Sequence, residues 1–244
     1  MIRRAIYLLA AVLLVACSPG GSAELTVDNV GGGAYIHSVF PAQAPKGAAA
    51  LVLKCKKGPV YGQLAIADVV LYKCARAAIT PPQGWTLTRD DGGDFVRQLL
   101  YWHAIRGDAP HENQWAFNLS STECQAQGAV VLLDGAALDS PIDASNGSGR
   151  GFQSGSAMKA KSVTSSRDGE LILTFFANDF GGAGFSAPDD VGEVIDEENN
   201  PGGYWIMGTY KRHRGATGDI VCHGDQGFHS VAATVAIRSL PASE

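Results

Sequence analysis

The chain has 244 residues, of which 45% are hydrophobic and 18% are charged, and its formal net charge is −5. The hydrophobic share excludes a disordered chain, the 30 glycines exclude a coiled coil, and the negative charge provides no electrostatic attraction to nucleic acid. The length is sufficient to bury a substantial core.

The N-terminal 16 residues have the pattern of an export signal. Arg3 and Arg4 precede an apolar run, Ala5–Val15, which is too short to span a bilayer as a helix. The run ends in the sequence Leu-Val-Ala-Cys at residues 14–17, which resembles the lipobox of bacterial lipoproteins. The resemblance implies cleavage after residue 16 and lipid attachment, such as palmitate, at Cys17. An ordinary signal peptide that contains a cysteine is the alternative interpretation.

The residues after Cys17 predict a flexible linker and the membrane in which the protein is anchored. The segment Ser18–Ala23 is rich in Gly, Ser and Pro, so residues 17–34 are expected to form a lipid anchor and a flexible linker. Ser18, by resemblance to lipoproteins, implies the outer membrane, with the protein on its periplasmic or its surface-exposed face. Residues 35–240 are then expected to form a single domain.

Short strand-like segments separated by turn sequences fill the rest of the chain. No segment carries the 3.6-residue apolar repeat of a capped amphipathic helix. Many short strands with Gly, Pro and Asn turns predict an all-β fold, a jelly-roll-like antiparallel β-sandwich. The predicted strands are Ala50–Cys55, Leu64–Tyr72, Phe95–Ile105, Trp115–Leu119, Ala129–Leu133, Lys159–Thr164, Glu170–Phe176, Tyr204–Tyr210 and Val231–Ile237. Several are apolar at successive positions, as expected of strands that are covered on both faces.

Three segments of the first half of the chain recur in the same order in the second half. The segments that begin at Gly62, Tyr101 and Gly128 resemble those that begin at Gly169, Tyr204 and Ser230. This order predicts two pseudo-repeated Greek-key halves that together close one sandwich. Chance similarity among β-rich segments is the alternative.

Besides Cys17 the chain has four cysteines, Cys55, Cys74, Cys124 and Cys222. An even number in an exported chain predicts two disulfides, and the lack of a Cys-x-x-Cys pair disfavours zinc. A bridge between Cys55 and Cys74 is disfavoured, because a straight strand between them would hold their Cα atoms too far apart. Tracing the strands as successive hairpins predicts the pairs Cys55–Cys124 and Cys74–Cys222.

A set of sequence signatures extends over roughly residues 35–238. The most specific is Ile79–Leu87, with the sequence ITPPQGWTL, and it is followed by Tyr101-Trp102 and later by Val231–Ile237. Together they resemble a β-sandwich module of phage tail and tail-fibre proteins and of secreted bacterial surface proteins. The resemblance implies a jelly-roll-like fold with a structural or adhesive role and transfers no catalytic residue. The cysteines and the lipoprotein form depart from the usual pattern of this family.

The most specific signature also makes sense as structure. Pro81 and Pro82 cannot donate hydrogen bonds to a sheet and therefore end a strand, and Gly84 permits a tight turn. Trp85 is then expected to plug one end of the core rather than to stack on a ligand.

Two groups of titratable residues are candidates for chemistry. His223, Asp225 and His229 would share one face of an extended segment, as an acid–base pair or as metal ligands, although their spacing matches no known metal motif and polar loop residues are the favoured interpretation. An acidic run offers oxygen ligands for calcium but lacks the order of a calcium loop, so a solvated acidic face is favoured and no cofactor is assigned. The run consists of Asp189, Asp190, Glu193, Asp196, Glu197 and Glu198.

Aromatic side chains near polar loops suit sugar binding, because a flat ring stacks on the apolar face of a pyranose. The candidates are Phe180, Phe185, Tyr204, Trp205 and Tyr210. The sequence thus predicts a non-enzymatic binding or structural lipoprotein of the outer membrane, with a glycan or a surface or phage protein as its ligand. A hydrolase of envelope or extracellular polysaccharide, which would use acidic residues or the histidine group, is the alternative.

Overall fold

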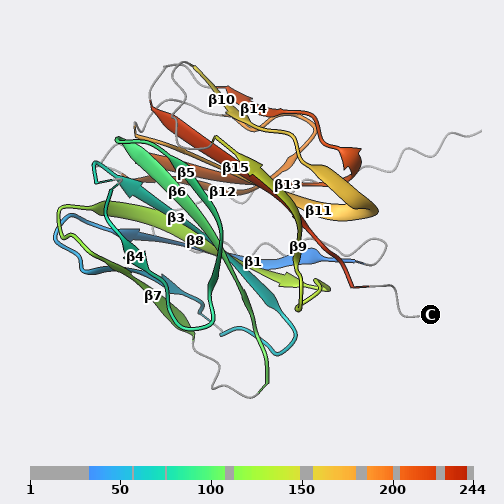
Figure 1. Ribbon diagram of the computed structural model, residues 1–244, viewed down its shortest axis with the longest axis horizontal. Helices are drawn as coiled ribbons and strands as arrows, with labels where there is room; N and C mark the ends of the chain where they lie inside the picture. Colours follow the sequence, from blue (N-terminus) through green and yellow to red (C-terminus); the bar gives the residue numbers. More distant parts are fainter. Residues whose placement is uncertain are drawn as a thin grey trace, which may run out of the picture.

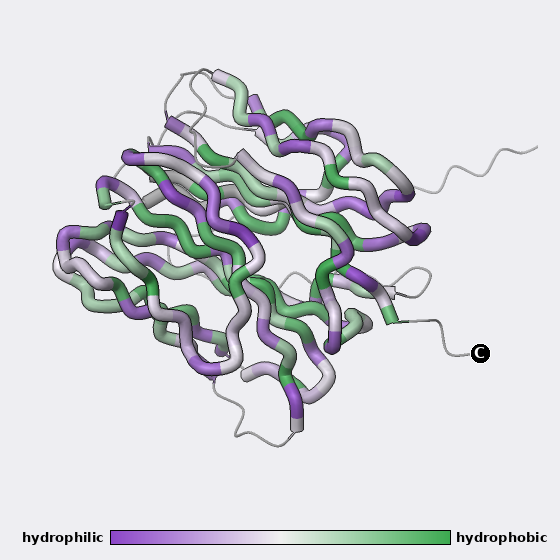
Figure 2. The backbone as a smooth tube through the Cα atoms, viewed as in Figure 1, coloured by the Kyte–Doolittle hydropathy of each residue, from purple (hydrophilic) through white to green (hydrophobic). Residues whose placement is uncertain are grey.

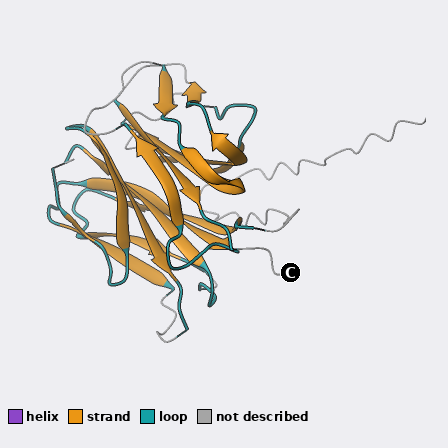
Figure 3. Ribbon diagram, turned by 45° about the vertical axis from the view of Figure 1, so that its right-hand side comes forward, coloured by secondary structure: helices purple, strands orange, loops and turns teal. Residues whose placement is uncertain are grey.

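The computed structural model describes residues 33–56, 58–74, 76–107, 113–148, 156–179, 186–199, 204–223 and 229–240. Within these ranges all regular secondary structure is β-strand, and no helix is long and apolar enough to cross a bilayer (Figures 1 and 3). The strands are β1 (Tyr35–Ala44), β2 (Ala50–Lys54), β3 (Leu64–Tyr72), β4 (Ile79–Thr80), β5 (Thr86–Gly92), β6 (Val96–Ala104), β7 (Gln114–Leu119), β8 (Gln125–Asp134), β9 (Ile142–Gly147), β10 (Ala157–Ala160), β11 (Thr164–Asn178), β12 (Gly192–Asn199), β13 (Tyr204–Ala216), β14 (Ile220–His223) and β15 (Ser230–Ile237).

The strands form four sheets that stack as layers. Two five-stranded antiparallel sheets, with orders β1-β8-β3-β6-β5 and β12-β13-β11-β15-β9, face each other in the middle. A three-stranded sheet, β2-β7-β4, covers the outer face of the first, and a two-stranded sheet, β10-β14, covers part of the outer face of the second. Figure 1 shows the two small sheets at opposite sides of the stack. The predicted all-β antiparallel sandwich is confirmed.

The main core lies between the two five-stranded sheets. It contains Ile66 and Val70 from β3, Leu173 and Phe175 from β11, and Val235 from β15. A second core fills the space between the first large sheet and the small sheet, which explains why all nine residues of β3 are buried. Strands covered on both faces lose the alternation of apolar and polar residues, as the sequence of β3 indicates. Figure 2 shows hydrophobic residues along these inner strands.

The two halves of the chain repeat one topology. A jelly roll orders its eight strands 1-8-3-6 in one sheet and 2-7-4-5 in the other. The first half follows this order with β1-β8-β3-β6 and β2-β7-β4, except that β5 pairs with β6. In the second half β9-β15-β11-β13 and β10-β14 occupy the corresponding places, and β12 takes that of β5. The predicted pseudo-repeat is therefore seen in the topology: each half builds its own pair of sheets with its own core, and the main core lies between the large sheets of the two halves.

Sequence reasoning missed the strands at the sheet edges. The strands β1 and β5 border the first large sheet, and β9 and β12 border the second. Edge strands have fewer buried positions, so their sequences lack the apolar runs that identified the central strands. The aromatic plug was predicted correctly: Trp85 is buried and packs edge-on against Trp115 and Phe117.

The predicted disulfide pairing is wrong, and the sheet topology explains the error. The structure pairs Cys74 with Cys124, with Cα atoms 5.2 Å apart, and leaves Cys55 and Cys222 as buried thiols. The prediction assumed successive hairpins, but β8 inserts beside β3, so that Tyr72 at the end of β3 pairs with Gln125 at the start of β8. Cys74 and Cys124 are thereby brought together. Cys222 lies in β14 on the far side of the second large sheet, out of reach of Cys74.

We expect Cys55 and Cys222 to resist alkylation in the folded protein. Burial raises the pKa of each thiol to about 12, and Asp196 and Glu193 add to the rise at Cys222. Because the thiolate is the reactive form, iodoacetamide at neutral pH should modify both residues only after unfolding. Peptide mapping without reduction should recover the Cys74–Cys124 bridge. Recovery of a Cys55–Cys124 peptide would contradict this topology.

The carboxyl group of Asp68 is buried in the main core. Asp68 lies on β3 between Ile66 and Val70 and is fully buried, and neither of its carboxyl oxygens has a hydrogen-bond partner among the described residues. Its neighbours in register are Leu100 on β6 and Ala129 on β8. Burial raises the pKa of Asp68 to about 8, because charge is unfavourable in apolar surroundings, and the nearby Gln98 amide lowers it only in part. Asp68 is therefore a neutral acid in the folded state at neutral pH.

Replacing this acid with its neutral isostere should remove one component of the pH dependence of folding. The pKa of Asp68 is about 8 when folded, against roughly 3.9 when unfolded, so the folded state retains a proton that the unfolded state releases between these values. The contribution of Asp68 to the free energy of unfolding is therefore most favourable below about pH 4, and it is lost progressively as the pH rises to about 8. In urea unfolding at several pH values, Asp68→Asn should gain stability over the wild type as the pH rises, by a few kcal/mol. A constant difference between the two proteins would contradict this assignment.

Candidate functional site

The sandwich has two ends, and the candidate site lies at the end remote from residue 33. We call this the distal end. It contains the last residue pair of β3 and β8, Tyr72 and Gln125, and the last pair of β11 and β15, Asn178 and Ser230. The turn between β5 and β6 closes over it and brings Phe95 from the first large sheet to His229 of the second.

A histidine and an aromatic ring form the centre of this end. The rings of Phe95 and His229 stack with centroids 3.9 Å apart and an angle of 6° between their planes. His229 is held from behind, since its ring Nδ1 donates to Oδ2 of Asp179 at 2.8 Å and its backbone N–H donates to Oδ1 at 3.1 Å. Phe95 is 45% exposed. Part of the Phe95 side chain therefore remains accessible to solvent while its ring is stacked on His229.

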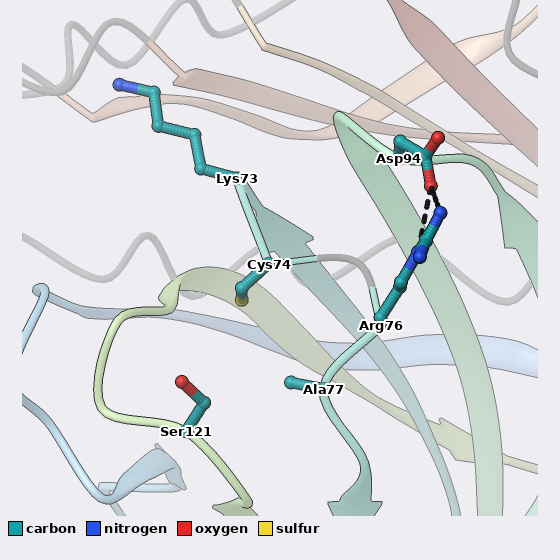
Figure 4. A pocket seen from close by; sticks show the side chains of 6 residues that line it. All are labelled: Lys73, Cys74, Arg76, Ala77, Asp94 and Ser121. Atoms are coloured by element: carbon teal, nitrogen blue, oxygen red, sulfur yellow. Dashed lines mark hydrogen bonds and ion pairs between the residues drawn. The ribbon is translucent and has the colours of Figure 1, made fainter.

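A groove of about 550 Å³ also lies at this end, and Figure 4 shows the side chains that line it. Cys74, which is bonded to Cys124, is one of its lining residues, and Lys73 donates its backbone N–H to the carbonyl of Phe95 at 3.0 Å, which links the groove to the stack. The residues that line the groove are Lys73, Cys74, Arg76, Ala77, Asp94 and Ser121. The distal end therefore combines an exposed aromatic residue with a polar groove that includes one cysteine of the disulfide.

The two halves fasten this end at equivalent positions with different chemistry. Cys124 immediately precedes β8 and is bonded to Cys74, just after β3. His229 immediately precedes β15 and is hydrogen-bonded to Asp179, just after β11. Because β3 and β8 occupy the places that β11 and β15 take in the second half, the disulfide and the His–Asp pair are topological counterparts.

The residues predicted to bind a ligand are only partly brought to this end. The backbone of Trp205 pairs with Asn178 and that of Tyr204 with Asn199, both near Asp179. Tyr210 lies farther along β13 and packs against the main core. Phe180 and Phe185 lie outside the described residues, although Phe180 follows Asp179 in the chain.

The predicted histidine group is not assembled as one site. Asp225 lies outside the described residues, and His223 is an exposed residue at the end of β14, whose carbonyl accepts from the N–H of Ser186. His229 is bonded to Asp179 instead. Among the residues the structure describes, no three His, Cys, Asp or Glu side chains are placed to hold a metal ion.

The acidic run is a strand and a turn rather than a loop. Asp189 and Asp190 form a turn, and Asp190 accepts from Lys211 at 3.1 Å. Glu193 and Asp196 lie on β12, where burial and the charge of Asp196 raise the pKa of Glu193. Glu197 and Glu198 belong to the same strand, in register with Ile206 and Trp205.

The opposite end receives the start of the described chain. We call it the proximal end. Ala34 is held there by Arg212, which donates to its carbonyl at 2.8 Å, and by Ser239, which accepts from its N–H at 2.9 Å. Nearby, Asp134 accepts from His37 at 2.9 Å and from Gln63 at 3.0 Å. The path of the chain into the sandwich is therefore fixed at the end remote from the groove.

Two neighbouring carboxyl groups at the proximal end have pKa values shifted in opposite directions. Asp143 accepts hydrogen bonds from the backbone and hydroxyl of Ser166 and from Arg238, which together lower its pKa to about 2 despite partial desolvation. Burial and the neighbouring Asp143 raise the pKa of Glu170, although a hydrogen bond from Ser165 opposes the rise. Two neighbouring carboxyl groups whose pKa values are displaced in opposite directions are an arrangement used in acid–base catalysis. Here the pair also anchors the bulge between Ser165 and Glu170.

Sequence reasoning identified His229 but missed its partners. Phe95, Lys73 and Asp179 are distant in sequence and meet only because β3, β6, β11 and β15 end together. The only local signal was the Asp91-Gly92-Gly93 turn, which placed Phe95 next to the tip of a hairpin.

Comparison of the chain with protein-family models, curated proteins and solved structures returned no match. The resemblances to bacterial lipoproteins and to phage tail modules therefore stay predictions from the sequence. The functional argument rests on the geometry of the two ends.

Proposed function

We propose that the protein is an outer-membrane lipoprotein, anchored through Cys17, that binds a glycan at its distal end without transforming it. The observation that carries the proposal is that the entry of the chain and the exposed aromatic residue lie at opposite ends of the sandwich. The chain enters at the proximal end, where Arg212 and Ser239 hold Ala34, and the exposed Phe95–His229 stack lies at the other end.

The distance between the ends suits this role. Strand β1 runs from the proximal end at Tyr35 to the distal end at Ala44, and its ten residues span roughly 34 Å. A chain tethered before residue 33 would therefore hold the aromatic stack and the groove at the side remote from its anchor. The Gly- and Ser-rich residues after Cys17 supply the flexible link.

The chemistry of the distal end supports a sugar as ligand. An exposed ring that is fixed by a stacked neighbour presents a flat apolar face at low entropic cost, and a pyranose has a matching face. The hydroxyl of Ser121 and the carboxylate of Asp94 in the adjoining groove can exchange hydrogen bonds with sugar hydroxyls. If the ring instead contacts a protein ligand, no glycan will be retained on the arrays.

Lipid attachment is tested by metabolic labelling. In a Gram-negative host given radiolabelled palmitate, the wild-type protein should incorporate label and fractionate with the outer membrane. Cys17→Ser should incorporate none and should lose its stable membrane association, because several acyl chains are needed for lasting anchorage. Labelling that persists in Cys17→Ser, or a soluble wild-type protein, would remove the anchor from the proposal.

The binding site is tested by comparing two exposed aromatic residues at opposite ends. Phe95→Ala removes the outer ring of the distal stack and should reduce retention on glycan arrays and on isolated cell envelopes by roughly tenfold. Tyr61→Ala is the matched control, because Tyr61 is 69% exposed and neighbours the proximal residue Gln63. Equal retention of both variants would place binding elsewhere.

The Asp143–Glu170 pair is the observation that favours the second candidate, polysaccharide hydrolysis. A glycosidase requires one carboxylate and one carboxylic acid, and the two pKa values here are displaced in those directions. Glu170 is buried, however, and both groups are occupied with Ser165, Ser166 and Arg238. Release of reducing ends in the binding incubations, abolished in Asp143→Asn, would replace binding with hydrolysis as the function.

A further inference from the structure

One of the residues that line the groove, Lys73, has a left-handed backbone conformation that side-chain-bearing residues rarely adopt. Lys73 has a φ of +62° and is the only residue other than glycine with a positive φ in the described ranges. This left-handed conformation costs a side-chain-bearing residue on the order of 1 kcal/mol, and glycine adopts it freely. It is imposed by the hydrogen bond from Lys73 to Phe95 and by the disulfide at the next residue, Cys74.

The side chain retained at this strained position is cationic and lines the groove. Strained residues persist where the surrounding structure fixes them, and they concentrate at binding sites. Lys73 and Arg76 leave the chain on either side of Cys74 and extend in different directions (Figure 4). The groove thus carries cationic groups at two separate places, together with the carboxylate of Asp94.

Arg76 already holds a carboxylate. Its Nε and one terminal nitrogen both donate to a single oxygen of Asp94, each at 3.2 Å. The side chains are 89% and 69% exposed, and such a pair contributes little to stability. A carboxylate from outside could take the place of Asp94 without a large loss, and a planar guanidinium recognises a carboxylate through paired hydrogen bonds.

We propose that this groove selects an acidic polysaccharide, with Lys73 and Arg76 each engaging an anionic group while a sugar ring stacks on Phe95. The inference rests on the proposed glycan-binding function and adds to it the class of ligand. The disulfide at Cys74 restrains the backbone from which Lys73 and Arg76 extend, which reduces the backbone freedom lost when a ligand binds.

The test compares polymers that differ only in charge. The full-length protein is immobilised and offered polygalacturonate and its methyl ester, and dextran sulfate and dextran. We expect each acidic polymer to bind at least about tenfold more tightly than its neutral counterpart, and the preference to fall as sodium chloride rises from about 50 to about 500 mM. Monomeric galacturonate should compete weakly.

Substitutions separate the ligand from the fold. Lys73→Gly relieves the strained conformation and should raise the melting temperature while it weakens binding of acidic polymers, an opposition that a purely structural residue would not produce. Arg76→Gln should weaken the same binding, and Asp94→Asn should strengthen it. Arg214→Gln is the matched control, because Arg214 is 80% exposed and paired with Asp168 at the proximal side, and it should change nothing.

The outcomes distinguish this inference from the function on which it rests. Equal binding of acidic and neutral polymers, reduced by Phe95→Ala alone, would overturn the selection of acidic ligands and retain the glycan-binding function. Binding of acidic polymers that Arg214→Gln weakens as much as Arg76→Gln would show diffuse attraction to the whole surface and would also overturn it. Absence of binding to every polymer would overturn both.

Discussion

The packing of two five-stranded sheets against each other is the constraint on which the rest of the structure depends. It buries one face of each sheet in a shared core, and the small sheets then cover much of what remains. Because β3 and β11 lie at the centre of their sheets, every chain segment that leaves them emerges at one of two ends. Loops from distant parts of the sequence thereby lie together at the distal end, and the start of the described chain at Ala34 lies at the proximal end.

The central strands could be predicted from the sequence, and the edges and the site could not. The apolar run of β3 and the recurrence of its pattern in β11 are local signals of burial on both faces. The position of β8 between β1 and β3 leaves no such signal, and the error in the disulfide pairing followed from it. The contact of Phe95 with His229 likewise depends on how the sheets are stacked, which short-range patterns do not encode.

The stacking of the two large sheets also gives the molecule two ends with different features. Hydrogen bonds from Arg212 and to Ser239 hold the entering chain at one end, and the exposed ring, the groove and the disulfide lie together at the other. A binding protein tethered by its N-terminus needs this separation, because a site beside the anchor would face the membrane. In the proposed function, the sandwich would be a spacer about one strand in length between the anchor and the binding site.

The two halves differ in the kind of bond that closes their equivalent corners at the distal end, and therefore in how easily each corner can open. The corner of the first half is closed by a covalent bond between sulfur atoms, which opens only on reduction, whereas that of the second half is closed by hydrogen bonds between His229 and Asp179. Hydrogen bonds at a partly exposed site break and re-form in thermal motion, and a covalent link does not. The corner of the first half is therefore the stiffer of the two, and if the distal end binds a bulky ligand as proposed, the second half is the part that can adjust to it.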